Sequence, residues 1–135
     1  MPASMLACID FTKDPVGQGP NTRGGASFRV FDPSGNQLPN TQIINLFTFT
    51  GLSCERQLEI RFRRPVGMVC MSLVRGAAAG KVGFFSPAGS TVGSVPTTLP
   101  QNVVQHVACN STATISRIVV IAPADETIVL ELCAG

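Results

Sequence analysis

Short runs of apolar and β-branched residues follow one another along the chain, with Gly and Pro between them. No stretch carries the three-to-four-residue apolar spacing of an amphipathic helix. The pattern predicts strands at about 5–12, 26–32, 41–50, 56–63, 67–74, 81–86, 91–95, 101–108, 114–121 and 127–133. Many short strands with turn residues between them are typical of a sandwich or barrel. We therefore expect one all-β domain over residues 1–135, an antiparallel β-sandwich with jelly-roll topology.

Alternation within the predicted strands indicates which side chains face the core. The segment 57–63 places its apolar residues on one face and its charged residues on the other, as expected for a half-solvated strand: Leu58, Ile60 and Phe62 against Gln57, Glu59, Arg61 and Arg63. In the segment 127–133 the core-facing residues are Ile128, Leu130 and Leu132, with Thr127, Val129, Glu131 and Cys133 facing out. The run Ile118-Val119-Val120-Ile121 is apolar on both faces, which predicts a central strand or one that a partner covers.

Turn chemistry adds two hairpin tips and one long loop. Phe31-Asp32-Pro33-Ser34-Gly35 and Phe85-Ser86-Pro87-Ala88-Gly89 each place Pro and Gly where a tight turn needs them. The longest irregular stretch is 13–25, which is rich in Gly and Pro. A loop of this length in a small domain is usually functional or disordered.

The two ends of the chain have matching spacing. If the first and last strands pair antiparallel with Cys8 opposite Cys133, a disulfide joins them and Asp10 falls opposite Glu131. Facing carboxylates repel and need a proton, a cationic neighbour or a metal ion. We therefore consider a structural Ca²⁺ site made of Asp10, Glu131 and Asp14, with loop carbonyls completing the oxygen set. The alternative is that the carboxylates point to water or pair with basic side chains.

Five cysteines in a chain of this size indicate an oxidising compartment, and we expect an extracellular or cell-surface protein. A second disulfide is expected between Cys54 and Cys109, and Cys70 reads as a buried free thiol. No C-x-x-C spacing indicates a zinc site. The sequence shows no signal peptide and no apolar run long enough to insert in a membrane.

Several short motifs together resemble a family of bacterial secreted β-sandwich proteins. They are Cys8-Ile9-Asp10-Phe11 followed by Asp14-Pro15-Val16-Gly17, Phe62-Arg63-Arg64-Pro65-Val66, the segment 82–89, and the tail from Ile115 to Cys133. The resemblance implies a galactose-binding-like jelly roll whose first and last strands are adjacent, with a structural calcium near that seam. Many members of the family bind carbohydrate or act as attachment domains.

Charge and composition narrow the function. Charged residues make up only 13% of the chain, apolar residues 44%, and the net charge is +2, which gives no reason to expect nucleic acid as a partner. The only His, His106, belongs to no catalytic motif, so we expect no enzyme. The arginines of 56–64 form either an anion-binding patch or a solvated strand face.

Two functions follow. The first is a non-catalytic interaction domain that forms homo-oligomers or larger assemblies through apolar strand faces. Its interface residues would be Phe84, Phe85, Ile118, Val119, Val120 and Ile121. The alternative is a carbohydrate-binding module that uses the loop 13–25. The absence of Trp and Tyr, the usual sugar-stacking residues, favours the first over the second.

Overall fold

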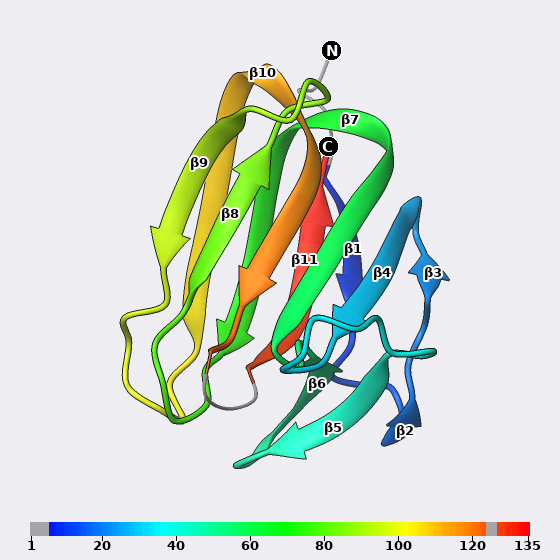
Figure 1. Cartoon of the computed structure of the whole chain (residues 1–135), viewed down its shortest axis with the longest axis vertical. Coiled ribbons are helices and arrows are strands. Elements are labelled where there is room, and N and C mark those ends of the chain that lie inside the picture. The colour runs from blue at the N-terminus through cyan, green and yellow to red at the C-terminus, as the bar shows by residue number, and fades with distance from the viewer. Residues whose placement is uncertain (1–5, 124–126) are drawn as a thin grey trace.

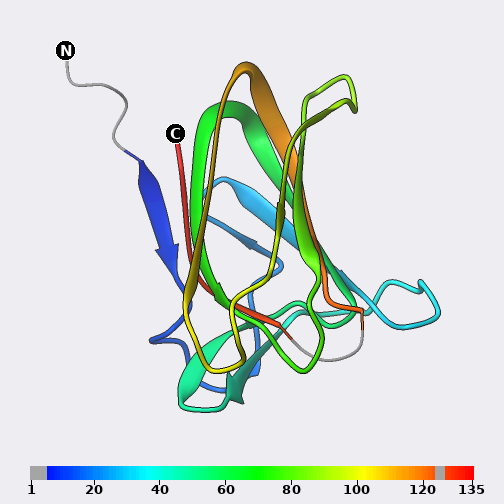
Figure 2. The same cartoon turned by 90° about the vertical axis from the view of Figure 1, so that its left-hand side faces the viewer.

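Two long strands run through both layers of the molecule. The computed structural model describes residues 6–123 and 127–135. The start of the chain, where we expect no signal peptide, lies partly outside the described residues. Strands β7 (Gln57–Val74) and β10 (Gln105–Ile121) pair antiparallel along most of their length. Both bend at one end of the molecule, so that each contributes one half to each layer (Figure 1 and Figure 2). The register between them shifts at this bend, between Asn110 and Arg117.

The first layer contains the first half of β7 and the second half of β10. Around this pair it adds β4 (Ala26–Phe31) on one side, and β8 (Lys81–Phe85) and then β9 (Thr91–Pro96) on the other. The two-residue β3 (Thr22–Arg23) pairs with β4 at the edge.

The second layer contains the other halves of β7 and β10. Beside β7 it adds β11 (Ile128–Ala134), and β11 in turn pairs with β1 (Ala7–Asp10). β6 (Phe49–Ser53) pairs with the start of β11, and β5 (Gln42–Leu46) and β2 (Gly17–Gln18) follow outward. The fold-class prediction is confirmed: the chain is an all-β, antiparallel sandwich whose first and last strands are hydrogen-bonded neighbours.

The register of the terminal strands is the predicted one. Cys8 lies opposite Cys133, and Asp10 lies opposite Glu131. The disulfide between Cys8 and Cys133 is present, with its two Cα atoms 4.0 Å apart. The first and last strands, β1 and β11, are therefore covalently joined and lie side by side in the second layer (Figure 2).

The core fills the space between the layers. Its largest fully buried side chains come from strands of both layers and from the segment after β1, and they include Phe11, Phe84, Leu58, Leu73 and Ile118. Phe11 packs edge-on against Phe28, with ring centroids 5.6 Å apart. In the described part of the chain, no helix is long and apolar enough to cross a membrane.

Both hairpin tips are confirmed. In the first, the Gly35 N–H donates to the Asp32 carbonyl at 3.0 Å, and in the second the Gly89 N–H donates to the Ser86 carbonyl at 2.9 Å. Both glycines have the positive φ that a residue at the end of such a turn needs, 83° and 88°.

Candidate ligand-binding groove

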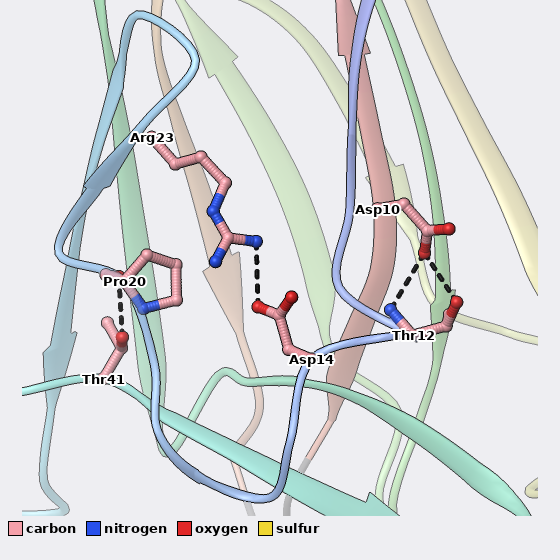
Figure 3. A network of polar contacts seen from close by, with 6 residues as sticks. All are labelled: Asp10, Thr12, Asp14, Pro20, Arg23 and Thr41. Carbon is pink, nitrogen blue, oxygen red and sulfur yellow. Dashed lines mark hydrogen bonds and ion pairs between the residues drawn. The ribbon is translucent and has the colours of Figure 1, made fainter.

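The long loop 13–25 is built from specific contacts. Asp14 pairs with Arg23 at 2.8 Å, and the Arg23 guanidinium also lies over the Phe11 ring, 5.7 Å from its centroid. The Thr41 hydroxyl donates to the Pro20 carbonyl at 2.7 Å (Figure 3). These contacts tie the loop to the core at Phe11 and to the start of β5, so its far end holds a defined position.

That far end is the corner Gly24–Gly25, which joins β3 to β4. Both glycines have positive φ, 60° and 80°, a conformation that L side chains rarely adopt. A Cβ on Gly24 would also lie 3.0 Å from the Ile9 side chain. Glycine therefore lets the loop turn closely over β1 and leaves open space beside it.

Next to this corner is a hollow of about 380 Å³ between the edges of the two layers. Its walls are mostly apolar, with two arginines: Ala7, Ile9, Gly24, Gly25, Ala26, Phe62, Arg63, Arg64, Val66, Leu132 and Ala134. Because Phe62 is only partly buried, its ring is available at the floor of this hollow. The apolar floor comes from four separate strands that only the fold brings together.

A second hollow of about 510 Å³ continues the first around the same corner. It shares five of the first hollow's residues and adds Thr22, Arg23, Ser27 and Arg61. We call the two hollows together the arginine groove. Its lining contains four arginines and no carboxylate.

Two of the four guanidinium groups are already engaged. Arg23 pairs with Asp14, and Arg61 pairs with Glu59 at 3.0 Å. Within residues 6–123 and 127–135, Arg63 and Arg64 make no ion pair, and both are exposed. The groove therefore combines an apolar floor with two free, fork-shaped hydrogen-bond donors.

Asp10 and Glu131 lie opposite each other as predicted, but the carboxylates of Asp10 and Asp14 already have partners within the chain. Asp10 Oδ1 accepts hydrogen bonds from the Thr12 hydroxyl at 2.6 Å and the Thr12 N–H at 2.9 Å, while Asp14 is held by Arg23 (Figure 3). The Glu131 carboxylate lies within 4.8 Å of the sulfurs of Cys8 and Cys133, and these form the disulfide. Calcium takes six to eight oxygens, so this donor set does not fit it as it stands. The metal site remains a prediction.

The Cys54–Cys109 disulfide prediction is wrong, because both thiols are free. Cys54 lies just before β7, near the strand end that pairs with Ile121, whereas Cys109 pairs with Val69 in the opposite half of the same strand. The strand register thus holds the two apart. Burial raises the pKa of Cys54 far above its usual value, as expected of an inert core thiol.

The proposed interface residues lie inside the molecule instead of on an exposed patch. Phe84, Ile118 and Val120 are fully buried, and β10 is a central strand between β7 and β8. Val119 is also buried, and Ile121 and Phe85 are partly buried. The Arg117 guanidinium lies over the Phe85 ring, 4.5 Å from its centroid, so this ring already has a partner within the chain.

Sequence reasoning missed the groove although its signals were present. The loop 13–25, the Gly24–Gly25 pair and the Arg63-Arg64-Pro65 run were each visible, but nothing in the sequence shows that the bend of β7 lies against that corner. His106 is exposed on the outer face of the second layer.

No family model matches the chain, and no curated protein matches its sequence. Several solved structures have a similar fold. Three of them are CsCBM6-3 from Clostridium stercorarium in complex with cellobiose (15% identity, TM-score 0.46), a family 6 carbohydrate-binding module studied by binding sub-site dissection (10%, 0.44), and BiXyn10A CBM1 without ligand (13%, 0.46). The matches cover 96% of this chain and 93%, 93% and 96% of those chains. With TM-scores below 0.5, they carry no argument about this chain's residues or function.

Proposed function

We propose that the chain is a non-catalytic, extracellular carbohydrate-binding domain whose arginine groove takes an acidic saccharide. The observation that carries this proposal is the pair Arg63 and Arg64, without an ion pair in the described residues, beside an apolar hollow that no carboxylate lines. The Cys8–Cys133 disulfide supports a location in an oxidising compartment.

The chemistry of the groove suits a sugar acid better than a neutral sugar. A pyranose ring has apolar C–H faces, which can lie on the floor formed by Phe62, Ile9 and Leu132. Its carboxylate can accept the paired N–H groups of an arginine, a contact that is stronger and more directional than a neutral hydrogen bond. Arginine pairing with the acid supplies the specificity that Trp or Tyr stacking supplies elsewhere.

This proposal replaces self-association as the leading interpretation. Four of the six proposed interface residues are buried in the core, and the Phe85 ring is stacked against Arg117. The loop 13–25, on which the carbohydrate alternative depends, contributes the glycine corner of the groove.

Titration calorimetry with an oligogalacturonide and with a neutral cello-oligosaccharide of the same length tests the proposal. We expect the acidic ligand to bind, the neutral ligand to bind weakly or not at all, and affinity to fall with added salt. Arg63→Ala and Arg64→Ala should each lower the affinity about tenfold, the loss expected for a charge-assisted hydrogen bond.

The matched control is Arg29→Ala, which removes an exposed arginine of β4 outside the groove and should leave affinity unchanged. Equal binding of acidic and neutral ligands, unaffected by both groove variants, would place the site elsewhere. Failure to bind any glycan on an array of acidic and neutral saccharides would overturn the carbohydrate function itself.

A further inference from the structure

Three cysteines lie in one row across the second layer. Cys133 of β11 is paired directly with Cys8 of β1 on one side and with Cys70 of β7 on the other. Directly opposed residues in an antiparallel sheet place their side chains on the same face. The free Cys70 thiol therefore lies next to the terminal disulfide.

This row faces outward. Val69 and Met71, the neighbours of Cys70 along β7, are buried in the core, so Cys70 points to the opposite face and is only half-buried. Beside the row is a hollow of about 260 Å³ lined by Cys70, Met71, Ser72, His106, Val107, Ala108, Glu131 and Cys133. Solvent and small reagents can thus reach the Cys70 sulfur.

The backbone allows a bridge between Cys70 and Cys133. Gly135 and Met68 exchange two backbone hydrogen bonds, each of 3.0 Å. In an antiparallel pair of strands, hydrogen-bonded and non-hydrogen-bonded residue pairs alternate. Cys133 and Cys70 lie two residues further along β11 and β7, so they are again a hydrogen-bonded pair. The Cα atoms of such pairs lie about 5.5 Å apart. That distance is inside the range of about 4.4–6.8 Å over which disulfides form.

We propose that Cys70 is an intramolecular exchange partner of the terminal disulfide. The Cys70 thiol gives up its proton and its sulfur bonds to Cys133 Sγ, while the Cys8–Cys133 bond breaks. The Cys8 sulfur leaves with the bonding electron pair and takes up a proton. One disulfide and one thiol are present before and after the step, so no oxidant or reductant is consumed.

The side chains around the three cysteines influence which of the two disulfides, Cys8–Cys133 or Cys70–Cys133, is favoured. His106, on the same face two residues from the Cys70 pairing position, can accept the thiol proton. The Glu131 carboxylate lies within 4.8 Å of both disulfide sulfurs, and its charge disfavours a thiolate on Cys8. After exchange β1 is no longer covalently bonded to β11, and it carries an exposed Cys8 thiol that can react with a small disulfide or a partner's cysteine.

Disulfide mapping of the full chain tests the proposal. The protein is incubated at pH 8.5, blocked with N-ethylmaleimide and digested without reduction. We expect two populations, one with Cys8 bonded to Cys133 and Cys70 labelled, the other with Cys70 bonded to Cys133 and Cys8 labelled. Cys70→Ser should abolish the second population, whereas Cys109→Ala, which removes the other half-buried thiol, should leave it unchanged.

A second variant tests the geometry directly. Cys8→Ser leaves Cys70 and Cys133 as neighbouring thiols, and oxidised glutathione should convert them to a disulfide. Overturning results would be a wild-type chain in which Cys70 is fully labelled with no Cys70–Cys133 peptide, or a Cys8→Ser chain whose two thiols acquire glutathione without joining.

Discussion

At the scale of single residues, Glu59 shows how neighbours reverse the effect of burial. The alternation of β7 predicts a solvated side chain here, yet Glu59 is only 7% exposed. It accepts hydrogen bonds from Arg61 at 3.0 Å and Arg117 at 3.3 Å. Burial acts to raise the pKa of Glu59, but the two arginines together lower it below the ordinary value of 4.5.

The lowered pKa of Glu59 predicts a loss of stability in acid. Because the unfolded chain binds the proton more tightly, the stabilisation is complete above about pH 4.5 and is lost as pH falls through the lower folded pKa. We expect Glu59→Gln to lower the free energy of unfolding at neutral pH by about 1–3 kcal/mol and to flatten its dependence on acid. Urea denaturation from pH 3 to 7 measures both effects. Glu131→Gln, which alters an exposed carboxylate, is the control. The prediction would be contradicted if the free energy of unfolding depended on pH equally in the wild type, Glu59→Gln and Glu131→Gln.

The Asp10 carboxylate, which faces Glu131 across the strand pair, is stabilised by neighbours in its own segment. The hydrogen bond from the Thr12 hydroxyl and then that from its N–H lower the pKa of Asp10, and Lys13 adds a smaller effect in the same direction. The ionised Asp10 carboxylate is thus stabilised by groups within its own segment of the chain.

A chelator distinguishes local pairing from a bound cation. With Asp10 and Asp14 engaged by Thr12 and Arg23, we expect the melting temperature to be the same in excess chelator and in millimolar calcium. A fall on chelation that calcium reverses would instead establish a structural ion, since a ligand of the folded state stabilises it by mass action. Asp10→Asn should then abolish the calcium response.

At the scale of elements, close strand approach depends on particular glycines. Gly51 of β6 faces β11 so closely that a Cβ would lie 2.6 Å from the Val129 carbonyl oxygen. Gly67, at the bend of β7, has no such neighbour, and the nearest atom would be 4.0 Å away.

We therefore expect Gly51→Ala to push β6 from β11 and to destabilise the fold by about 1–3 kcal/mol, the usual range for overpacking. Gly67→Ala should change the free energy of unfolding by less than about 1 kcal/mol. Chemical denaturation of the two variants gives the comparison. Equal losses would show that the β6–β11 contact does not limit stability.

Local pattern predicted most strands but could not predict how they join. The segments 56–63 and 67–74 became one strand, and so did 101–108 and 114–121, because the chain bends at 64–67 without leaving the sheet. The segment 41–50 split at Phe47, whose φ of 57° reverses the chain into the β5–β6 hairpin. Positive φ at a phenylalanine has no sequence signature.

A bulge also reversed an assignment in the last strand. The pairing of β11 with β7 shifts between Val129 and Glu131, so Val129 points into the main core while Ile128 and Leu130 form a second, smaller cluster. Period-two alternation cannot anticipate an inserted residue. The terminal register was predictable because Cys8 and Asp10 match Cys133 and Glu131 in both spacing and order, whereas the arginine groove depends on contacts between distant strands.

At the scale of the whole molecule, one covalent bond closes nearly the entire chain. Cys8 and Cys133 are 125 residues apart, and β1 pairs with no strand other than β11 in the described residues. Closing a loop of this length restricts the unfolded ensemble far more than it changes the folded state.

Removing this bond should lower stability by about 4–5 kcal/mol on the loop-entropy model. The suitable variant is Cys8→Ser with Cys133→Ser, since a single substitution leaves a thiol that can bond to Cys70. Guanidinium denaturation without reductant should give a lower midpoint for the double variant, and Cys109→Ala should keep the wild-type midpoint. Reduction of the wild-type protein should reproduce the loss. If the double variant and the wild type unfold at the same midpoint, the pairing of β1 with β11 and the burial of Phe11 hold the ends together without the bond.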